Sequence, residues 1–234
     1  MYKKFEGENV VFDYTDFHDK KRYKVTKKIM RFLLLFTHRI KFIGKENIPE
    51  KGGFIVASNH VSNIDPAFIM LSTKKPIHFM AKAELFTNSF KSFWLQAFNA
   101  FPVKRGTSDR SSIDYAIELI KQEKVLGMFP EGTCSEDGIP LPAKAGVALV
   151  AKATGADVLP VAICSKNRGH VFQTITVRIG KLITYQELGL TPDKRSSSEL
   201  KSATREIMDK IVKLWEKGPN AYDNKKIKAE KNGN

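Results

Sequence analysis

Apolar and polar residues alternate along this chain in blocks that predict strands and helices in turn. Five short apolar runs, rich in Val, Ile and Phe, have the length and composition of buried strands. They cover residues 54–57, 77–81, 125–129, 158–163 and 174–179. Between and after these runs, apolar residues recur three or four positions apart, which is the helical period, near 113–120, 143–154 and 200–214. The alternation of strands and helices predicts an α/β domain.

The N-terminal part has a different pattern. Lys and Arg crowd residues 20–28, and an apolar run follows over residues 29–36, broken by Arg31. The run is far shorter than the roughly 20 residues that span a bilayer. Charges follow it closely and no small-residue cleavage site is present, which argues against a secretory signal. We predict that residues 1–42 form a basic, amphipathic helical segment that lies in a membrane interface. The alternative is a helix packed on the domain with its lysines in solvent.

The composition of the chain indicates the charge of its partners and the redox state of its compartment. The 234 residues carry 39 Lys and Arg and a formal charge of +14, which predicts an anionic partner: nucleic acid, a membrane surface, an acidic carrier or a phosphorylated substrate. The two cysteines, Cys134 and Cys164, form no CxxC pair, so we expect a reducing cytoplasmic setting, and nothing in the spacing predicts a metal site. We expect one α/β domain over residues 43–218 and a disordered, lysine-rich tail over 219–234.

The most informative stretch is residues 59–66, Asn-His-Val-Ser-Asn-Ile-Asp-Pro. It directly follows an apolar run, and the ends of buried strands are where α/β sheets carry their chemistry. His60 and Asp65 are little more than one helical turn apart, so the carboxylate can hold the imidazole. A held imidazole is a general base with an ordinary pKa near ~6.5. Such a base can take the proton of a substrate hydroxyl, and no serine or cysteine nucleophile is required.

Three further segments accompany this pair in a fixed order: Phe-Pro-Val-Lys-Arg-Gly at 101–106, Phe-Pro-Glu-Gly-Thr at 129–133 and Val-Leu-Pro-Val-Ala-Ile at 158–163. With residues 59–66, they resemble the 1-acylglycerol-3-phosphate O-acyltransferase (lysophosphatidic acid acyltransferase) family. The resemblance runs from about Gly44 to about Gly180. It implies a mixed central sheet flanked by helices, with a membrane-binding helical segment attached at the N-terminus.

The segments suggest separate tasks in acyl transfer from a thioester to an alcohol. Arg105 offers planar, bidentate hydrogen bonds to a phosphate, and the resemblance assigns its position to the acceptor phosphate. We expect Glu131 to orient Arg105 or to bind the glycerol hydroxyl. Gly132 lets the backbone approach a ligand, and Thr133 offers a hydroxyl and an N–H.

Two lysines enter by the resemblance alone. The backbone N–H of Lys82 corresponds to an oxyanion donor, and Lys144, two residues before Gly146, corresponds to a lysine that supplies positive charge. The chain departs from the family pattern at one position, because Cys134 stands where the family usually has arginine. This departure makes the acceptor less certain. Since the sequence places no base beside Cys134, we interpret it as a substitution and not as a nucleophile.

Large aromatic residues recur at helical spacing over residues 86–101. We expect them to be mainly core, with an acyl-chain groove or a membrane contact as the alternative.

The predicted function is an acyltransferase on the cytoplasmic face of the cell membrane that forms phosphatidic acid from 1-acylglycerol 3-phosphate. Acyl-CoA or acyl carrier protein is the co-substrate, and no metal or bound cofactor is expected. The alternatives are the same chemistry on another lysolipid, or a non-catalytic basic membrane-binding protein. Nucleic acid is not expected as a partner, because the aromatics are not interleaved with Arg and no nucleic-acid-binding motif is present. The sequence does not specify the oligomeric state.

Overall fold

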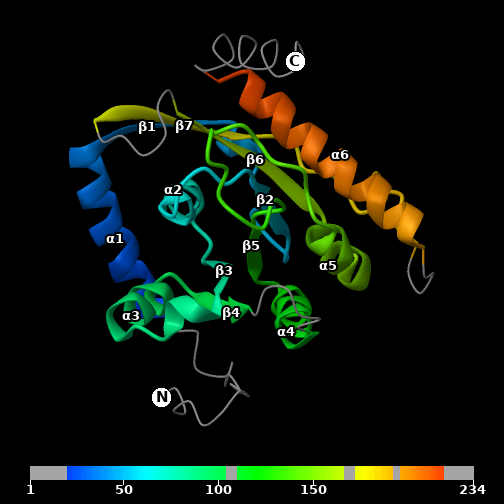
Figure 1. Cartoon of the computed structure of the whole chain (residues 1–234), viewed down its shortest axis with the longest axis horizontal. Coiled ribbons are helices and arrows are strands. Elements are labelled where there is room, and N and C mark those ends of the chain that lie inside the picture. Colours follow the sequence, from blue (N-terminus) through cyan, green and yellow to red (C-terminus); the bar gives the residue numbers. More distant parts are fainter. Residues whose placement is uncertain (1–19, 104–109, 166–171, 192–195, 219–234) are drawn as a thin grey trace.

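The computed structural model describes residues 20–103, 110–165, 172–191 and 196–218. Its centre is a seven-stranded sheet with the strand order β1-β7-β6-β2-β5-β3-β4 (Figure 1). The strands are β1 (His38–Ile43), β2 (Ile55–Ser58), β3 (Ile77–Lys82), β4 (Ala100–Val103), β5 (Val125–Met128), β6 (Val158–Ser165) and β7 (Gln173–Ile179). The helices are α1 (Lys20–Thr37), α2 (Asp65–Ser72), α3 (Ser89–Ala97), α4 (Arg110–Lys121), α5 (Gly146–Thr154) and α6 (Ser197–Glu216), with short 3₁₀ turns η2 (Lys45–Asn47) and η3 (Ala83–Phe86).

The sheet is mixed, and its strand directions define the edge that carries the site. β6, β2, β5, β3 and β4 run parallel to one another. β7 is antiparallel to β6, and β1 runs parallel to β7. The carboxyl ends of the five parallel strands therefore meet at one edge of the sheet, and the amino ends of β1 and β7 lie at that same edge.

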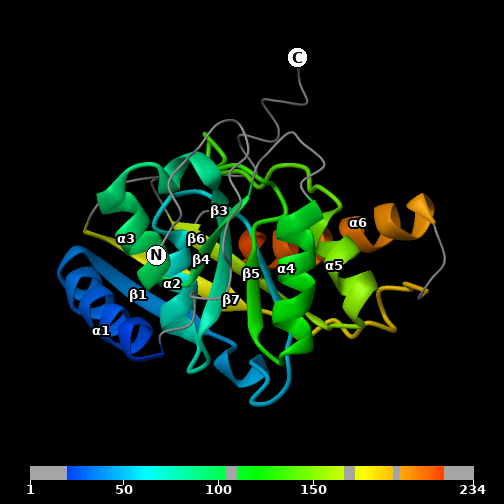
Figure 2. The same cartoon turned by 90° about the horizontal axis from the view of Figure 1, so that it is seen from below.

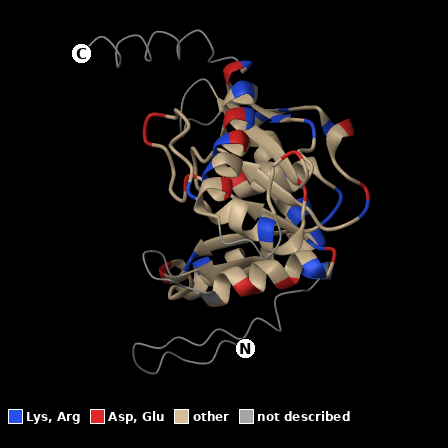
Figure 3. Ribbon diagram, turned by 90° about the vertical axis from the view of Figure 1, so that its right-hand side faces the viewer, with Lys and Arg blue, Asp and Glu red and all other residues tan. Residues whose placement is uncertain are grey.

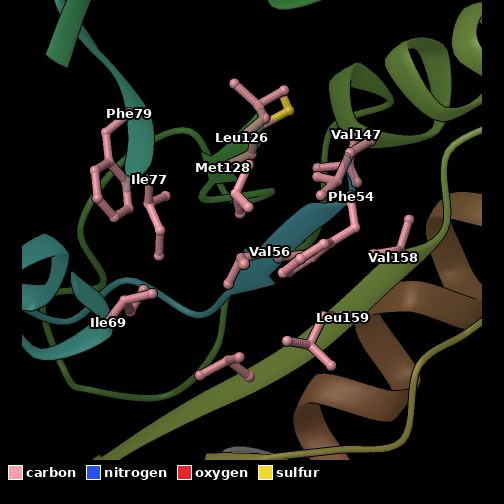
Figure 4. Packing of buried hydrophobic residues seen from close by; sticks show 14 of the residues in the cluster. Phe54, Val56, Ile69, Ile77, Phe79, Leu126, Met128, Val147, Val158 and Leu159 are labelled. Atoms are coloured by element: carbon pink, nitrogen blue, oxygen red, sulfur yellow. The ribbon is translucent and has the colours of Figure 1, made fainter. Parts of the chain in front are cut away.

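Helices cover both faces of the sheet. α1, α2 and α3 lie on one face of the sheet, and α4, α5 and α6 lie on the other. Two perpendicular views show this arrangement (Figures 1 and 2). Every residue of β2 and β5 is buried, which is typical of parallel strands packed on both faces. Figure 4 shows core side chains from both faces, including Ile69 of α2 and Val147 of α5.

A glycine in the middle of β5 makes room for a bulky neighbour. A Cβ on Gly127 would lie 2.4 Å from the Phe79 ring, so only glycine leaves the space that this ring occupies on β3. Phe79 in turn stacks on Phe129, with ring centroids 6.2 Å apart. Because Gly127 has no side chain, Phe79 can occupy the position in which it stacks on Phe129, just after β5.

The helix ends follow local sequence. The side chain of Ser196 accepts a hydrogen bond from the Glu199 N–H at the start of α6, which is the N-cap that a Ser-x-x-Glu sequence favours. Gly155 ends α5 in the left-handed conformation with φ 69°.

The N-terminal boundary differs from the sequence prediction. Residues 38–42 were expected in the helical segment, but they form most of β1, which pairs with β7 along its whole length. The sheet therefore begins at His38 and not at residue 43. The alternating exposure of β1 explains the error, because an edge strand with every second residue in solvent resembles a basic helix end in composition. The tail over residues 219–234 lies outside the described part of the chain.

Candidate active site

The site forms where the loops after β2 and β5 meet. β2 and β5 are adjacent and parallel, with Ala57 opposite Met128, so the segments 59–66 and 129–135 leave the sheet side by side. The chain after β2 is also tied to β6. The Asn59 side chain accepts from the Ile163 N–H at 2.8 Å and donates to the Ile163 carbonyl at 3.1 Å. The buried Asn59 amide thus pairs with both backbone groups of Ile163 and fixes the position of the residue after it, His60.

His60 and Asp65 are in direct contact. Nδ1 of His60 lies 2.9 Å from Oδ2 of Asp65, and the same oxygen accepts from the backbone N–H groups of Val61 and Ser62 at 2.7 and 2.8 Å. Asp65 is the first residue of α2 and is followed by Pro66, a common arrangement at a helix start, where a carboxylate is favoured. Because a carboxylate accepts, Nδ1 carries a proton, and Nε2 is the ring nitrogen that can take up a second proton when the ring is neutral.

The loop after β5 holds His60 from three sides. The Glu131 carboxylate accepts from the His60 N–H at 2.9 Å, and the Ser135 N–H donates to the His60 carbonyl at 2.7 Å. The Phe129 ring stacks on the imidazole, with centroids 4.0 Å apart and an interplanar angle of 16°. The two hydrogen bonds, each worth roughly 1 kcal/mol, fix the His60 backbone, while the Phe129 ring and Asp65 contact the imidazole itself.

Cys134 provides a contact that the sequence did not reveal. Its Sγ lies 3.2 Å from Nε2 of His60 and 3.6 Å from Oδ1 of Asn63. The interpretation that no base lies near this thiol is therefore wrong. The contact joins residues 74 positions apart, and only the pairing of β2 with β5 brings them together.

The electrostatics follow from burial and neighbours. Burial lowers the pKa of His60, but the hydrogen bonds and charges of Asp65 and Cys134 outweigh it and raise the pKa to about 9. Burial raises the pKa of the Glu131 carboxyl to about 7, against the lowering effect of the backbone N–H groups of His60 and Leu141. Oε2 of Glu131 is buried, and no described group meets it with hydrogen-bond geometry, although the Leu141 N–H is near enough to lower the pKa of the carboxyl.

The other predicted residues lie along the same edge or outside the described chain. Gly132 has φ 72°, and a Cβ there would lie 3.1 Å from Nζ of Lys144, so the lysine side chain crosses over this glycine. Thr133 is exposed, and Lys82 is exposed at the end of β3. Arg105 lies outside the described residues, two positions after β4 ends at Val103. Because β3 and β4 are parallel and pair at Lys82 and Val103, both chains leave the sheet at the edge that carries His60.

Glu131 has a contact that the sequence did not suggest, because one of its oxygens accepts from the His60 N–H. Its expected contact with Arg105 or with a glycerol hydroxyl stays a prediction, since Arg105 lies outside the described residues. Phe129 and Asn59 were not predicted to position His60. Their place at or near the ends of apolar runs was the only indication in the sequence. Among the described residues, no three His, Cys, Asp or Glu side chains are grouped as metal ligands.

The fold and this edge define a class. An α/β sheet with a buried His-Asp pair at the carboxyl end of β2, and with Lys82 at the end of β3, is typical of an enzyme that transfers a group at this edge.

Comparisons with known proteins identify the family. Residues 39–164 match the family model described as Acyltransferase. The chain is 32% identical over 148 residues to the 1-acyl-sn-glycerol-3-phosphate acyltransferase of Bacillus subtilis, covering 63% of this chain and 73% of that protein. It is 30% identical over 182 residues to the protein of the same name from Borreliella burgdorferi, covering 76% and 72%. The chain belongs to the acyltransferase family, and within it to the group of 1-acyl-sn-glycerol-3-phosphate acyltransferases.

A solved structure agrees on the fold. The crystal structure of the 1-acyl-sn-glycerophosphate acyltransferase from Thermotoga maritima matches with a TM-score of 0.64 and 24% identity, covering 82% of this chain and 77% of that one. The predicted mixed sheet flanked by helices is thus confirmed.

The raised pKa of His60 can be measured directly. In an NMR titration of the His60 ring we expect a midpoint near pH 9, because Asp65 and Cys134 both favour the protonated ring. Cys134→Ala removes one of these neighbours, so its midpoint is expected at lower pH. A midpoint near the ordinary ~6.5 in both proteins would contradict the contact between thiol and imidazole.

Proposed function

We propose that this protein transfers an acyl group from acyl-CoA or acyl carrier protein to the sn-2 hydroxyl of 1-acylglycerol 3-phosphate and so forms phosphatidic acid. The observation that carries the proposal is the His60–Asp65 contact at the carboxyl edge of the sheet, in a chain of this family. Both substrates together supply all the reacting groups, so the proposed reaction needs no metal or bound cofactor.

The chemistry follows from the proton positions at His60. Nε2 takes the proton of the acceptor hydroxyl as the oxygen attacks the thioester carbonyl, and Asp65 stabilises the imidazolium that forms. The tetrahedral intermediate then collapses, the C–S bond breaks, and the leaving thiolate recovers the proton from Nε2. Because Cys134 contributes to the raised pKa of His60, displacement of the thiol by a substrate hydroxyl lowers that pKa toward the working range of a base.

The acceptor phosphate requires positive charge near the same edge. Arg105 is the proposed bidentate partner, since it follows β4 by two residues. Lys144 contributes a second charge over Gly132. Lys82 is the last residue of β3, beside Val103 of β4. We propose that the Lys82 backbone N–H stabilises the oxyanion of the intermediate.

Cys134 supports an alternative acceptor substrate. Cys134 replaces the arginine that the family usually has, which removes a cation from the third segment. A lysolipid with a less negative headgroup is therefore the alternative substrate of the same chemistry.

The substrate proposal is tested with purified protein, several lysolipid acceptors, and palmitoyl-CoA or palmitoyl carrier protein as donor. We expect the highest kcat/KM with 1-acylglycerol 3-phosphate. A higher kcat/KM with lysophosphatidylcholine or lysophosphatidylethanolamine would show that this lysolipid, and not 1-acylglycerol 3-phosphate, is the preferred acceptor. No transfer to any lysolipid would contradict the proposed function.

We also propose that the protein binds the cytoplasmic face of an anionic membrane through α1. Tyr23 and Leu34 of α1 pack into the domain, but other apolar side chains of the helix face solvent. Leu35 is one of these and lies at the margin of the others, which we define as the apolar face of α1: Val25, Ile29, Phe32, Leu33 and Phe36. They recur three or four residues apart, so they form one stripe, and Phe32 and Phe36 are 61% and 66% exposed.

Charge and position support this surface. α1 contains no acidic residue, and Lys24, Lys28 and Arg31 are exposed beside the apolar face. The opposite side of the molecule, where α6 lies, mixes acidic and basic residues (Figure 3). Phe90 and Phe93 of α3, 73% and 57% exposed, extend the apolar surface next to α1. A helix with a bulky apolar face and flanking lysines is typical of an interfacial anchor.

The anchor is a peripheral one in this proposal. Among the described residues, no helix is long and apolar enough to cross a membrane. α1 ends at Thr37, and β1 begins at His38 at the edge that carries His60, so the C-terminal end of the apolar face, with Phe32 and Phe36, lies toward that edge.

Replacing Phe32 and Phe36 together by serine is expected to weaken binding to vesicles of anionic phospholipid. Each buried phenylalanine contributes about 1.5 kcal/mol or more, so the partition coefficient should fall by about 10²-fold in a flotation assay. Leu149→Ser on α5 is the matched control, since Leu149 is also an exposed apolar residue but lies on the other side of the sheet. Equal binding by the double variant and the control would contradict the role of α1.

A further inference from the structure

A thiol, an imidazole and a carboxylate lie in sequence at the proposed active site. Sγ of Cys134 contacts Nε2 of His60 at 3.2 Å, and Nδ1 of the same ring contacts Oδ2 of Asp65 at 2.9 Å. A nucleophile within hydrogen-bond reach of a base, with the base oriented by a third group, is the arrangement that covalent catalysis uses. The atom that must take the acceptor's proton is thus already in contact with a nucleophile of the protein itself.

The two cysteines of the chain differ in the way this role requires. Cys134 is partly exposed and can meet a substrate. Cys164 is fully buried in β6, and burial raises the pKa of its thiol to about 12. Only Cys134 combines access with a neighbouring base, and a cysteine is reactive as the thiolate that such a base forms.

We propose that Cys134 carries the acyl group as a thioester between the donor and the acceptor, so that the enzyme works in two half-reactions. This proposal rests on the acyl transfer proposed above. It changes the path and leaves the substrates the same.

The two half-reactions balance without any additional reactant. In the first, His60 takes the Cys134 proton, Sγ attacks the donor carbonyl, the bond to the donor sulfur breaks, and the donor thiolate takes the proton from Nε2. In the second, Nε2 takes the proton of the acceptor hydroxyl, the oxygen attacks the acyl-cysteine, and the proton passes to the departing Sγ. The first half-reaction exchanges one thioester for another and is close to thermoneutral, while formation of the oxygen ester drives the second.

A second group on the same loop supports an acceptor at this place. Oε2 of Glu131 is buried without a hydrogen-bond partner among the described residues, although its companion Oε1 holds the His60 backbone. An unpaired buried carboxylate oxygen favours a hydrogen-bond donor, and a polyol acceptor brings hydroxyl donors to the loop.

In the alternative path, the acceptor hydroxyl displaces the thiol from Nε2 and attacks the donor directly, and Cys134 is never acylated.

The test is intact-mass spectrometry of the full chain incubated with palmitoyl-CoA or palmitoyl carrier protein, without acceptor. We expect one palmitoyl adduct on the wild type and on Cys164→Ala, and none on Cys134→Ala. The adduct should disappear within seconds when 1-acylglycerol 3-phosphate is added, and neutral hydroxylamine should also remove it. Cys134→Ser should retain a hydroxylamine-resistant ester, which identifies the position even if the alanine variant folds poorly.

Kinetics give an independent readout. Double-reciprocal plots at several donor concentrations should be parallel for the wild type, and Cys134→Ala should lose at least tenfold in kcat. The proposal is overturned if the wild type turns over but is never acylated, if the adduct is not consumed by the acceptor, or if Cys134→Ala retains the full rate with intersecting plots. Those results leave the proposed function intact, whereas failure of the wild type to acylate any lysolipid contradicts the function itself.

Discussion

Replacing His60 by alanine is expected to lower kcat for acyl transfer by about 10²- to 10⁴-fold, the usual contribution of a general base. The imidazole takes the proton in every path considered, whether the nucleophile is the acceptor hydroxyl or the Cys134 thiol. No other described histidine contacts Asp65 or Cys134 in a way that substitutes for it. Initial rates with palmitoyl-CoA and 1-acylglycerol 3-phosphate measure the loss.

His78→Gln is the matched control for this change. His78 is also a buried histidine with a hydrogen bond, to the Val125 carbonyl, but it lies near the start of β3, at the sheet edge away from His60. We expect this variant to retain its rate within a few-fold. Vesicle binding should persist in both variants. If His60→Ala kept more than about a tenth of the wild-type rate with its fold intact, His60 would not be the base.

Removal of Asp65 is expected to damage both the rate and the fold. Asp65 is fully buried, and its Oδ2 accepts from the His60 ring and from two backbone N–H groups. Asp65→Ala leaves these donors without an acceptor at a cost of about 1–3 kcal/mol for each buried group. We expect a clearly lower Tm and a loss of at least about 10²-fold in kcat, because the ring is no longer held.

Asp65→Asn separates the charge from the hydrogen bonds. The amide oxygen can still accept at the Oδ2 position, so the Tm should fall less than in Asp65→Ala. The negative charge is lost, however, so the pKa of His60 should fall below its wild-type value of about 9. A rate equal to that of the wild type, at all pH values, would show that the carboxylate does not act on His60.

The sequence predicted the interior of the sheet better than its edges. The five strands recognised from apolar runs correspond to β2, β3, β5, β6 and β7. β1 was missed because alternate residues face solvent. β4 was missed because the four residues Ala100–Val103 include a proline and follow a helix with the same aromatic composition.

The aromatic stripe was only half understood. Phe86 and Phe101 are buried, as the core interpretation predicted, but Phe90 and Phe93 are among the most exposed side chains of the described chain. Helical spacing identifies residues on one face of a helix, and it does not identify what that face meets. For α3 the two exposed rings face away from the domain.

The candidate site was predicted where neighbours in sequence make it, and missed where distant segments do. His60 and Asp65 are five positions apart, so spacing alone predicted their contact. The contacts of His60 with Phe129, Glu131 and Cys134 depend on β5 lying beside β2. Strand order is a property of the whole fold, and no local pattern in the sequence specifies it.

The junction of α1 and β1 has a consequence for how the protein meets its substrate. Thr37 ends the helix and His38 starts the strand with no linker between them, and the His38 ring packs on Phe68 of α2, the helix that begins at Asp65. The proposed anchor is therefore joined to the helix that carries Asp65 by the chain itself and by a direct ring contact. Docking through α1, as proposed above, would therefore bring the loop that carries His60 and Asp65 to the membrane surface together with the helix.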